Sequence, residues 1–325
     1  MWAVGTWWLT RRQPTLHLRC LLYYWLSTTY IFSFMPPSLL LKRSLLFLVL
    51  VTAQLGQAQT ISGTITDAKS QVGVPFVNIG VLGKTVGTVA NEQGAYQLAV
   101  AGASPNDTVR ISSVGFKPRN LTVRELTSQP NLALRPEAIA LGEVKVRAKT
   151  LFKRTHTLGN TTNSETSTLT LSAKDLGSEI GTVISLKRKP TKVLNANFNV
   201  AYNRAGSLTF RVNLYRLLPN GKPSDVKLVT RNIIVTSAVA KGPIAVDLTA
   251  DQLILDEDFF LTLEWIGGGD AKQVSNQLAF SAGLGYANND LYLRETSQAA
   301  WERASAGAVL AGMQPKISFY VTVQD

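Results

Sequence analysis

The sequence contains very few of the side chains that carry thiol or imidazole chemistry. Among its 325 residues there are one cysteine, Cys20, and two histidines, His17 and His156. Cys20 and His17 precede a predicted signal-peptide cleavage site, so the remaining chain can form neither a disulfide nor a thiolate metal site. A single histidine also leaves little from which to assemble a Ser–His or Cys–His nucleophile. Composition therefore argues against nucleophilic catalysis.

Long apolar runs are absent after residue 59, which excludes a membrane protein with several spanning helices. Before that point, Met35 is followed by a basic pair, Lys42-Arg43, then an apolar run and the small residue Ala58. This order is typical of a secretory signal peptide cleaved after Ala58 or Gln59. We therefore expect residues 1–59 to be a leader, translation to start at Met35, and the protein to be exported to the periplasm, the outer-membrane surface or the extracellular space.

A second apolar stretch, Cys20–Phe34, leaves one alternative open for this leader. Together with the residues up to Leu41 it approaches the roughly 20 apolar residues of a spanning helix, which would anchor the chain in a membrane. Pro36-Pro37 interrupt the stretch, and proline breaks the interior of a helix. We favour the signal peptide.

Acidic residues are missing from residues 1–59, which hold five of the 33 basic side chains. The remaining 266 residues carry 28 basic and 21 acidic side chains and no dense basic run, so we expect no nucleic-acid partner. The short basic stretch Leu186–Pro190 is typical of a solvated loop or strand end. Its alternative role is binding to an anionic surface such as lipopolysaccharide, and peripheral membrane association is compatible with this charge.

Helical periodicity is also absent, whereas short alternating runs divided by Gly, Asn, Asp and Pro recur along the chain. Such runs predict an all-β fold with two antiparallel sandwiches. We predict domains at 60–147 and 168–325, joined by a polar linker at 148–167. Within the second domain, Asn220-Gly221 predicts a tight turn between strands. The predicted strands are 60–66, 76–81, 96–100, 108–114, 143–147, 208–215, 226–235, 244–248, 259–265 and 317–323.

Five ordered motifs in the first domain point to a known module. They are Ile61-Ser-Gly-Thr-Ile-Thr-Asp, Val74-Pro-Phe-Val-Asn-Ile, the turn-containing run Thr85–Leu98, Ile111-Ser-Ser-Val-Gly-Phe-Lys and Leu141-Gly-Glu-Val-Lys-Val. The segment Ile61–Arg147 resembles the carboxypeptidase-like regulatory domain, a transthyretin-like β-sandwich found in secreted and outer-membrane proteins of the Bacteroidetes. The resemblance implies a sandwich without catalytic residues of its own. Gly94 and Gly115 suit turns, Asn91 an Asx turn, and Tyr96 and Phe116 the inside of the sandwich.

The resemblance does not imply peptidase activity. In metallocarboxypeptidases the module accompanies a separate catalytic domain that binds zinc through a His-x-x-Glu pair and a second histidine, and this chain has only His156 after its leader. The module also precedes the large barrel of TonB-dependent receptors, but the 178 residues after Arg147 are too few for about 22 strands. A small outer-membrane barrel of about 8 strands fits by length and remains an alternative. Charged residues within or beside the strand alternation argue against it, namely Arg211, Lys227, Arg231 and Glu264.

The second domain carries a looser pattern over residues 209–266. It comprises the runs Phe210–Tyr215, Asn232-Ile-Ile-Val, Val246-Asp-Leu-Thr and Asp258–Trp265. This pattern resembles jelly-roll modules of secreted proteins of the same bacteria, many of which are attached to carbohydrates. The resemblance implies an antiparallel sandwich and a glycan as one class of ligand.

Aromatic side chains are the candidate ligand-binding residues, because flat rings on a sandwich face or loop can stack on sugar rings. Trp301 lies in a polar context, with Tyr286 and Tyr292 nearby in the sequence, and these three form the predicted site. Trp265 lies in a dense apolar strand and is expected in the core.

Metal ions and cofactors are not expected. Acidic residues gather at Asp247, Asp251 and 256–258, and Asp270 follows three glycines, but no spaced calcium-loop motif is present. Solvated loop ends explain these carboxylates. Glycoside hydrolysis needs only two acids at the right separation, so a hydrolytic role stays open as an alternative.

The sequence thus favours an exported, non-enzymatic protein of the cell envelope that acts in binding or assembly. Its expected partner is an envelope protein or a surface glycan. The alternatives are a carbohydrate-binding or hydrolytic module and the small outer-membrane barrel.

Overall fold

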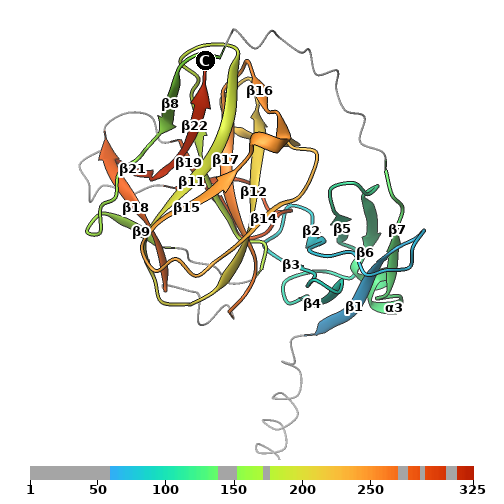
Figure 1. The fold of residues 1–325 in the computed structure, drawn as a ribbon. Helices are drawn as coiled ribbons and strands as arrows, with labels where there is room; N and C mark the ends of the chain where they lie inside the picture. The colour runs from blue at the N-terminus through green and yellow to red at the C-terminus, as the bar shows by residue number, and fades with distance from the viewer. Residues whose placement is uncertain (1–58, 138–151, 171–175, 270–276, 286–289, 305–312) are drawn as a thin grey trace, which may run out of the picture. The chain divides into compact units, whose positions relative to one another are not determined.

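The computed structural model describes residues 59–137, 152–170, 176–269, 277–285, 290–304 and 313–325. The residues from Gln59 to Asp325 form one compact unit, and the regular secondary structure of its described residues is almost all β-strand (Figure 1). The all-β fold class expected from the alternating sequence is therefore confirmed. None of the helices in these ranges has the length and apolar character needed to span a bilayer. The predicted signal peptide, up to Ala58, lies outside the described residues.

The first seven strands form two small sheets with a core between them. One sheet has the order β4-β1-β7, in which β7 is parallel to β1, and the other has the order β3-β2-β5-β6. The predicted alternation is visible in β4, where Tyr96 and Leu98 are buried and Ala95 and Gln97 are exposed. The elements are β1 (Thr60–Asp67), β2 (Asn78–Val81), β3 (Gly87–Val89), β4 (Ala95–Ala99), β5 (Thr108–Ser112), β6 (Arg119–Thr122), α3 (Val123–Ser128) and β7 (Leu132–Leu134).

Two local signals shape this first region. The side-chain carboxamide oxygen of Asn91 accepts hydrogen bonds from the backbone nitrogens of Gln93 and Ala95, at 3.0 and 2.9 Å, which confirms the predicted Asx turn. Gly94 completes the turn with φ of +80°, and a Cβ there would lie 2.4 Å from the carbonyl oxygen of Ile65. Only glycine fits this conformation and this close approach.

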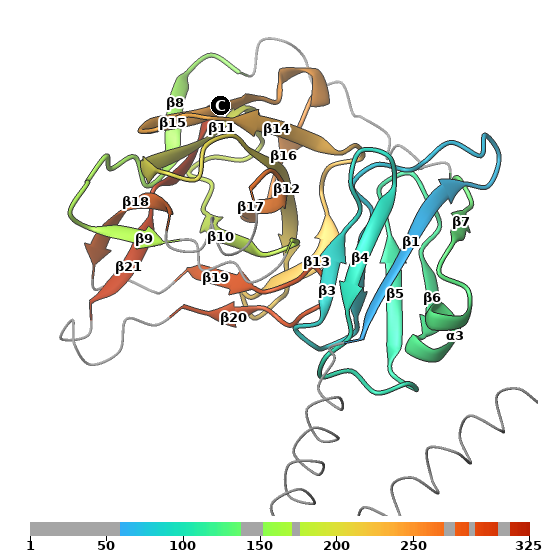
Figure 2. The same ribbon diagram turned by 90° about the horizontal axis from the view of Figure 1, so that it is seen from below.

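A short helix that was not predicted, α3, follows β6 (Figure 2). Thr122 is its N-cap: its hydroxyl accepts from the backbone nitrogen of Glu125 at 3.1 Å, and a Glu125 carboxylate oxygen accepts from the Thr122 nitrogen at 2.7 Å. This reciprocal pair is a capping box. Val123 and Leu126 are the buried residues of the helix.

The second region is built from a seven-stranded and an eight-stranded sheet. The seven-stranded sheet has the order β13-β12-β17-β10-β19-β20, with β14 also paired to β12, and the eight-stranded sheet has β21-β18-β11-β22-β8, with β15, β16 and β9 attached to its central strands. Their bounds are β8 (Thr155–Gly159), β9 (Thr168–Thr170), β10 (Glu179–Ile184), β11 (Thr191–Asn203), β12 (Leu208–Leu217), β13 (Pro223–Lys227), β14 (Ile233–Ser237), β15 (Gly242–Asp247), β16 (Ile254–Leu255), β17 (Phe259–Gly267), β18 (Leu278–Gly285), β19 (Leu291–Arg294), β20 (Glu302–Arg303), β21 (Gln314–Ile317) and β22 (Phe319–Gln324).

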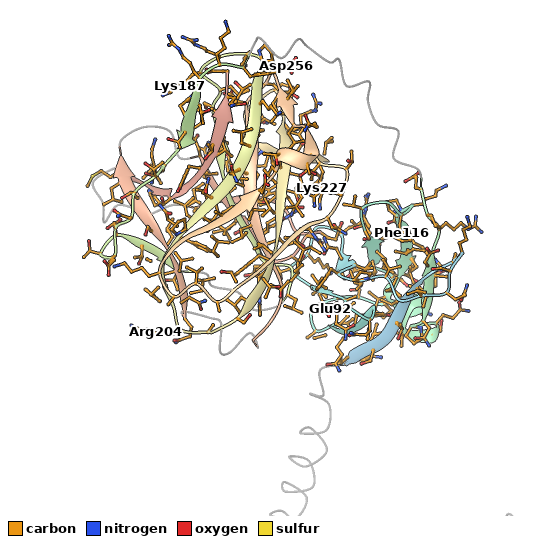
Figure 3. All side chains as sticks on the ribbon, in the orientation of Figure 1. Glu92, Phe116, Lys187, Arg204, Lys227 and Asp256 are labelled. Carbon is orange, nitrogen blue, oxygen red and sulfur yellow. The ribbon has the colours of Figure 1, made fainter. Side chains whose placement is uncertain are left out.

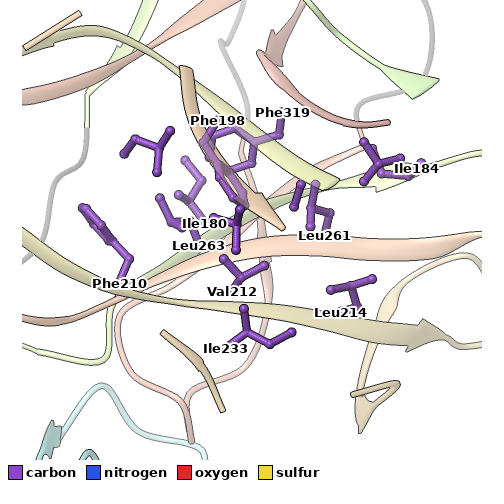
Figure 4. Close-up of a cluster of buried hydrophobic side chains, with 14 of the residues drawn as sticks. Ile180, Ile184, Phe198, Phe210, Val212, Leu214, Ile233, Leu261, Leu263 and Phe319 are labelled. Carbon is purple, nitrogen blue, oxygen red and sulfur yellow. The ribbon is translucent and has the colours of Figure 1, made fainter. Parts of the chain in front are cut away.

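The main hydrophobic core lies between these two sheets (Figure 4). Alternate residues of β12 and β17 point into it, and Phe198 and Phe319 meet there edge to face with ring centroids 4.7 Å apart. Trp265 is fully buried, as predicted. Fully burying one such apolar side chain contributes about 1.5–3 kcal/mol, so this core is the chief stabilising element of the region.

Part of the segment predicted as a linker, 148–167, forms a strand. Thr155–Gly159 form β8, which pairs antiparallel with Tyr320–Gln324 of β22, and His156 lies 3.5 Å from the Asp325 carboxylate. Only Leu158 of this strand is buried, so the sequence of β8 lacks the apolar alternation by which a strand is predicted. Backbone hydrogen bonds, which do not depend on apolar side chains, hold it at the edge of the sheet.

Two other expectations in the second region are met in different degrees. The turn at Asn220-Gly221 is confirmed, since it joins β12 to β13 with Gly221 at φ +78°. The predicted strand 226–235 is interrupted: β13 ends at Lys227 and β14 begins at Ile233, and both pair with β12. Figure 3 shows Lys187 of the predicted basic loop and Asp256 at the same end of this region. Leu186–Pro190 is a mostly exposed loop, as expected.

Candidate functional site

Four charged side chains lie in one row across the outer face of the seven-stranded sheet, the face turned away from the main core. The strand register places Arg211 of β12 opposite Glu264 of β17, Glu264 opposite Glu179 of β10, and Glu179 opposite Arg294 of β19. All four residues are at most 5% exposed. Because facing residues of adjacent strands have Cβ atoms about 5 Å apart, the register alone brings these side chains together.

Hydrogen bonds satisfy both carboxylates of this row. Arg211 Nη1 donates to Glu264 Oε2 at 3.1 Å, and Arg294 Nη2 donates to Glu179 Oε2 at 2.6 Å. Asn213 lies between them, and its Nδ2 donates to Glu179 Oε1 at 2.8 Å and to Glu264 Oε2 at 3.0 Å. Each carboxylate therefore has a guanidinium on one side and a shared amide donor on the other, which offsets the repulsion between two buried anions.

Three further side chains complete this arrangement. Tyr215 Oη donates to Glu179 Oε2 at 3.3 Å and accepts from Arg294 Nη2 at 2.8 Å. The Thr262 hydroxyl donates to Glu179 Oε1. Lys227, opposite Tyr215 in the register and labelled in Figure 3, donates from Nζ to Asn213 Oδ1 at 2.7 Å. We call these eight residues the charge cluster: Glu179, Arg211, Asn213, Tyr215, Lys227, Thr262, Glu264 and Arg294.

Burial and neighbouring charges set the protonation of the cluster. Burial would raise the pKa of Glu179, but the Arg294 charge and the Thr262 hydrogen bond outweigh it and hold the pKa below its ordinary value. Burial, with the Glu179 charge, raises the pKa of Tyr215 well above 10. Burial, with the Arg211 charge, lowers the pKa of Lys227 to about 8. Glu179 is thus ionised and the Tyr215 phenol neutral near pH 7.

An aromatic group covers one end of the charge cluster. The Trp301 ring lies edge to face with Phe260, with centroids 4.9 Å apart, and the Arg294 guanidinium lies 4.1 Å from the Trp301 ring centroid. Tyr292 packs against Phe260 at 5.8 Å. Gly181 makes room for this packing, because a Cβ there would lie 2.5 Å from the Thr262 methyl group and 2.9 Å from the Phe260 ring.

A cavity of about 700 Å³ borders the charge cluster. Arg211 connects its two sides, since Nη1 also donates to Asn78 Oδ1 at 3.1 Å and Nη2 donates to the carbonyl oxygen of Phe76. The backbone nitrogen of Gly83 donates to the carbonyl oxygen of Gln298 at 3.0 Å, and both residues line the cavity. Its polar and charged lining comprises Asn78, Arg110, Ser112, Ser113, Glu137, Arg211, Tyr215, Asp225, Lys227, Asn232, Arg294, Ser297 and Gln298.

The two glutamates are not placed for glycoside hydrolysis. Neither Glu179 nor Glu264 is among the described residues that line the cavity, and their side chains are 0 and 1% exposed. Hydrolytic carboxyl groups must stand on either side of a sugar ring, about 5 to 10 Å apart. These two instead share the Nδ2 group of Asn213 and face arginines.

The first β region has a known relative at the level of sequence. Residues 61–146 match the CarboxypepD_reg-like domain. This agrees with the resemblance expected over Ile61–Arg147, and it places Asn78 and Arg110 of the cavity wall inside that domain. None of the curated proteins matches the chain.

Solved structures resemble the chain only weakly. The cysteine protease and lectin-like domains of Cwp84, a surface layer associated protein of Clostridium difficile, are 13% identical over 45% of this chain and 32% of theirs, with a TM-score of 0.33. The clostridial cysteine protease Cwp84 after propeptide cleavage is 10% identical over 80% and 61%, with a TM-score of 0.38. A chain in the structure of infectious bursal disease virus Gx strain is 12% identical over 82% of this chain and 63% of its own length, with a TM-score of 0.26. The chain thus spans less than two thirds of each, and these likenesses assign no function.

The structure describes two of the three predicted ligand-binding residues, Trp301 and Tyr292, and both pack on Phe260. Trp301 is partly buried against Tyr215 and Phe260, and its buried Nε1 has no hydrogen-bond partner among the described residues. Tyr292 is only 3% exposed, so its ring is not available as a stacking surface, a correction caused by its packing on Phe260. Tyr286 lies outside the described residues.

Two of the acidic residues singled out in the sequence, Asp251 and Asp247, stabilise loops. Asp251 pairs with Arg231 at 2.6 Å, and Asp247 accepts from the Thr249 nitrogen at 2.8 Å. Within the described ranges, no three His, Cys, Asp or Glu side chains converge on a point where a metal ion would fit. Asp270 lies outside these ranges.

Sequence reasoning missed the centre of the site. Glu179 was not singled out, and Arg211, Lys227 and Glu264 were noted only as charges within or beside strand alternation. These charges within or beside apolar strands were the sequence signal from which the site could have been found. Where both faces of such a strand are buried, a charged side chain must be paired with an opposite charge.

Proposed function

We propose that this protein is an exported, non-enzymatic protein of the cell envelope that binds a surface glycan in the cavity beside the charge cluster. The observation that carries the proposal is the polar wall of this cavity, whose Arg211, Tyr215 and Arg294 side chains are fixed by hydrogen bonds to buried partners. Side chains already held in place lose little conformational entropy when a ligand binds.

The chemistry of the wall suits a polyhydroxylated ligand. It presents hydroxyls, amides and charged groups of both signs, which can donate to and accept from sugar hydroxyls. The volume of about 700 Å³ lies within the range of small-ligand sites. Glu179 and Glu264 would not act as hydrolytic carboxyl groups, because they lie behind this wall and bind its arginines.

Affinity electrophoresis of the purified protein in a panel of polysaccharides tests the proposal, with reducing-end release assayed in the same samples. We expect retardation by at least one polymer without release of reducing ends. Ser113→Trp, which fills the cavity, should abolish the retardation, whereas Ser70→Trp in an exposed turn outside the cavity should leave it unchanged.

Two results would contradict the proposal. Release of reducing ends would identify an enzyme. If no polymer retards the protein, or if Ser113→Trp and the unmodified protein are retarded equally, the cavity does not bind a glycan of the panel. An envelope protein would then be favoured as the partner.

A further inference from the structure

Two cations of the cavity wall stand apart from the others because they lack a carboxylate. Arg211 is paired with Glu264, and Arg294 with Glu179 and Asp225. Neither Arg110 nor Lys227, which also line the cavity, forms an ion pair with any residue that the structure describes. Arg211 and Arg294 thus face three carboxylates, and Glu137 also lines the cavity, so Arg110 and Lys227 are the cations of the described wall that remain available to an anion.

Lys227 is the more constrained of the two. Its Nζ makes a hydrogen bond to Asn213 Oδ1 at 2.7 Å and lies 5.8 Å from the centroid of the Tyr215 ring. An ammonium group has three N–H donors, so the bond to Asn213 leaves two for another acceptor. Burial, together with the neighbouring Arg211 charge, disfavours the charged form of the Lys227 ammonium group and so lowers its pKa. An anion in the cavity would remove that penalty.

Arg110 adds a second cation to the cavity wall, from the first β region. It lies on β5, opposite Gly80 of β2 and Asn120 of β6, and is half-buried. A guanidinium presents a planar pair of N–H donors that fits the two oxygens of a carboxylate or a sulfate. Ser297 and Gln298 line the same cavity and offer partners for neighbouring hydroxyls.

We infer that the ligand of this cavity is an acidic saccharide whose anionic group is bound by Lys227 and Arg110 while its hydroxyls meet the neutral polar wall. This inference rests on the proposed glycan-binding function and names its class of ligand. Carboxylated and sulfated sugars share the chemistry, so both are included in the test.

Isothermal titration with short oligosaccharides tests the inference, because oligomers limit the general attraction between a basic protein and a long polyanion. The probes are trigalacturonate, a sulfated galactose trisaccharide and neutral galactotriose. We expect one of the two acidic probes to bind at least tenfold more tightly than the neutral one.

Matched variants locate the anionic group. Lys227→Met and Arg110→Gln should each weaken the acidic probe at least tenfold and weaken the neutral probe by much less, while Lys227→Arg, which keeps the charge, should retain more of the affinity for the acidic probe than Lys227→Met does. Lys222→Met removes the same charge from an exposed turn outside the cavity and should have no effect. Circular dichroism of each variant confirms that it is folded.

The outcomes separate the inference from the proposed function. If acidic and neutral probes bind equally and Lys227→Met changes neither, while Ser113→Trp abolishes both, the acidic class is wrong and the glycan site stands. If Lys222→Met weakens the acidic probe as much as Lys227→Met does, binding is unspecific attraction and the inference is overturned. If Ser113→Trp changes nothing, the glycan site itself is wrong.

Discussion

The two β regions differ in what they bury. Among the described residues, Asn78 is the single buried polar side chain of the first region, whereas the second buries the charges of Glu179, Arg211, Glu264 and Arg294. The difference follows from coverage. In the first region β4 exposes every second residue, while eight consecutive residues of β17 are buried. A strand covered on both faces must be apolar throughout or must pair its polar side chains, and β17 does the latter on its outer face.

The comparison teaches that burial has different consequences in the two regions. In the first region the buried side chains are almost all apolar, and removing one leaves a cavity. In the second region, removing one member of the charge cluster leaves its partner ionised without a counter-charge. A missing partner costs more than a missing methyl group, because desolvating an unpaired charge is the larger penalty.

The largest effect is therefore expected from Glu179→Ala, which leaves Arg294 and Asn213 without their buried acceptor. We expect the free energy of unfolding to fall by about 3–5 kcal/mol, measured by urea denaturation. Glu165→Ala, which removes the exposed partner of Lys241, should cost at most about 1 kcal/mol. Equal losses for the two variants would show that the charge cluster has no special energetic role.

A core substitution in the first region should have a slightly smaller effect. Leu98→Ala removes a fully buried side chain and should lower the free energy of unfolding by about 2–5 kcal/mol. Leu82→Ala, at a residue that is 42% exposed, should change it by no more than about 0.5 kcal/mol.

The same variant shows whether the two regions unfold together. After residue 59 the sequence has two tryptophans, Trp265 and Trp301, and both lie in the second region. The tryptophan fluorescence of the protein without residues 1–59 therefore reports on that region, whereas far-ultraviolet circular dichroism reports on both. We expect Leu98→Ala to shift both transitions, because Arg211 bonds to Phe76 and Asn78. A shift confined to circular dichroism would make the two regions independent units.

The smallest effect is expected at the end of α3. Thr122→Ala removes the hydroxyl that accepts from the Glu125 nitrogen and should cost about 1 kcal/mol of unfolding free energy. Thr122→Ser keeps the hydroxyl and should restore most of the loss in the same denaturation experiment. Equal stability of the alanine and serine variants would mean that the capping box contributes nothing measurable.

Most strands could be predicted because alternation with period two is a local property of the sequence. β1, β4, β12 and β17 lie where that alternation was seen. The edge strand β8 could not be found this way, since only Leu158 among its side chains is buried. The helix α3 could have been found, because Thr122 and Glu125 have the spacing of a capping box.

The candidate site was predicted less well than the fold. Trp301 does contact the charge cluster, through Arg294 and Tyr215, but it covers the cluster instead of presenting a free ring. The charged residues of the row come from distant parts of the sequence, from Glu179 to Arg294. No local sequence pattern relates one of them to another. Local patterns mark such residues as unusual but do not pair them.

The sequence by itself determined the strand-rich composition, the match of residues 61–146 to the CarboxypepD_reg-like domain, and the scarcity of cysteine and histidine. The tertiary structure alone decided that Arg211, Glu264, Glu179 and Arg294 form one row and that Lys227 stands beside it at a cavity wall. The physical reason is strand register: a slip of one residue in any of these strands would turn its charge to the opposite face, and register is fixed by the packing of the whole sheet.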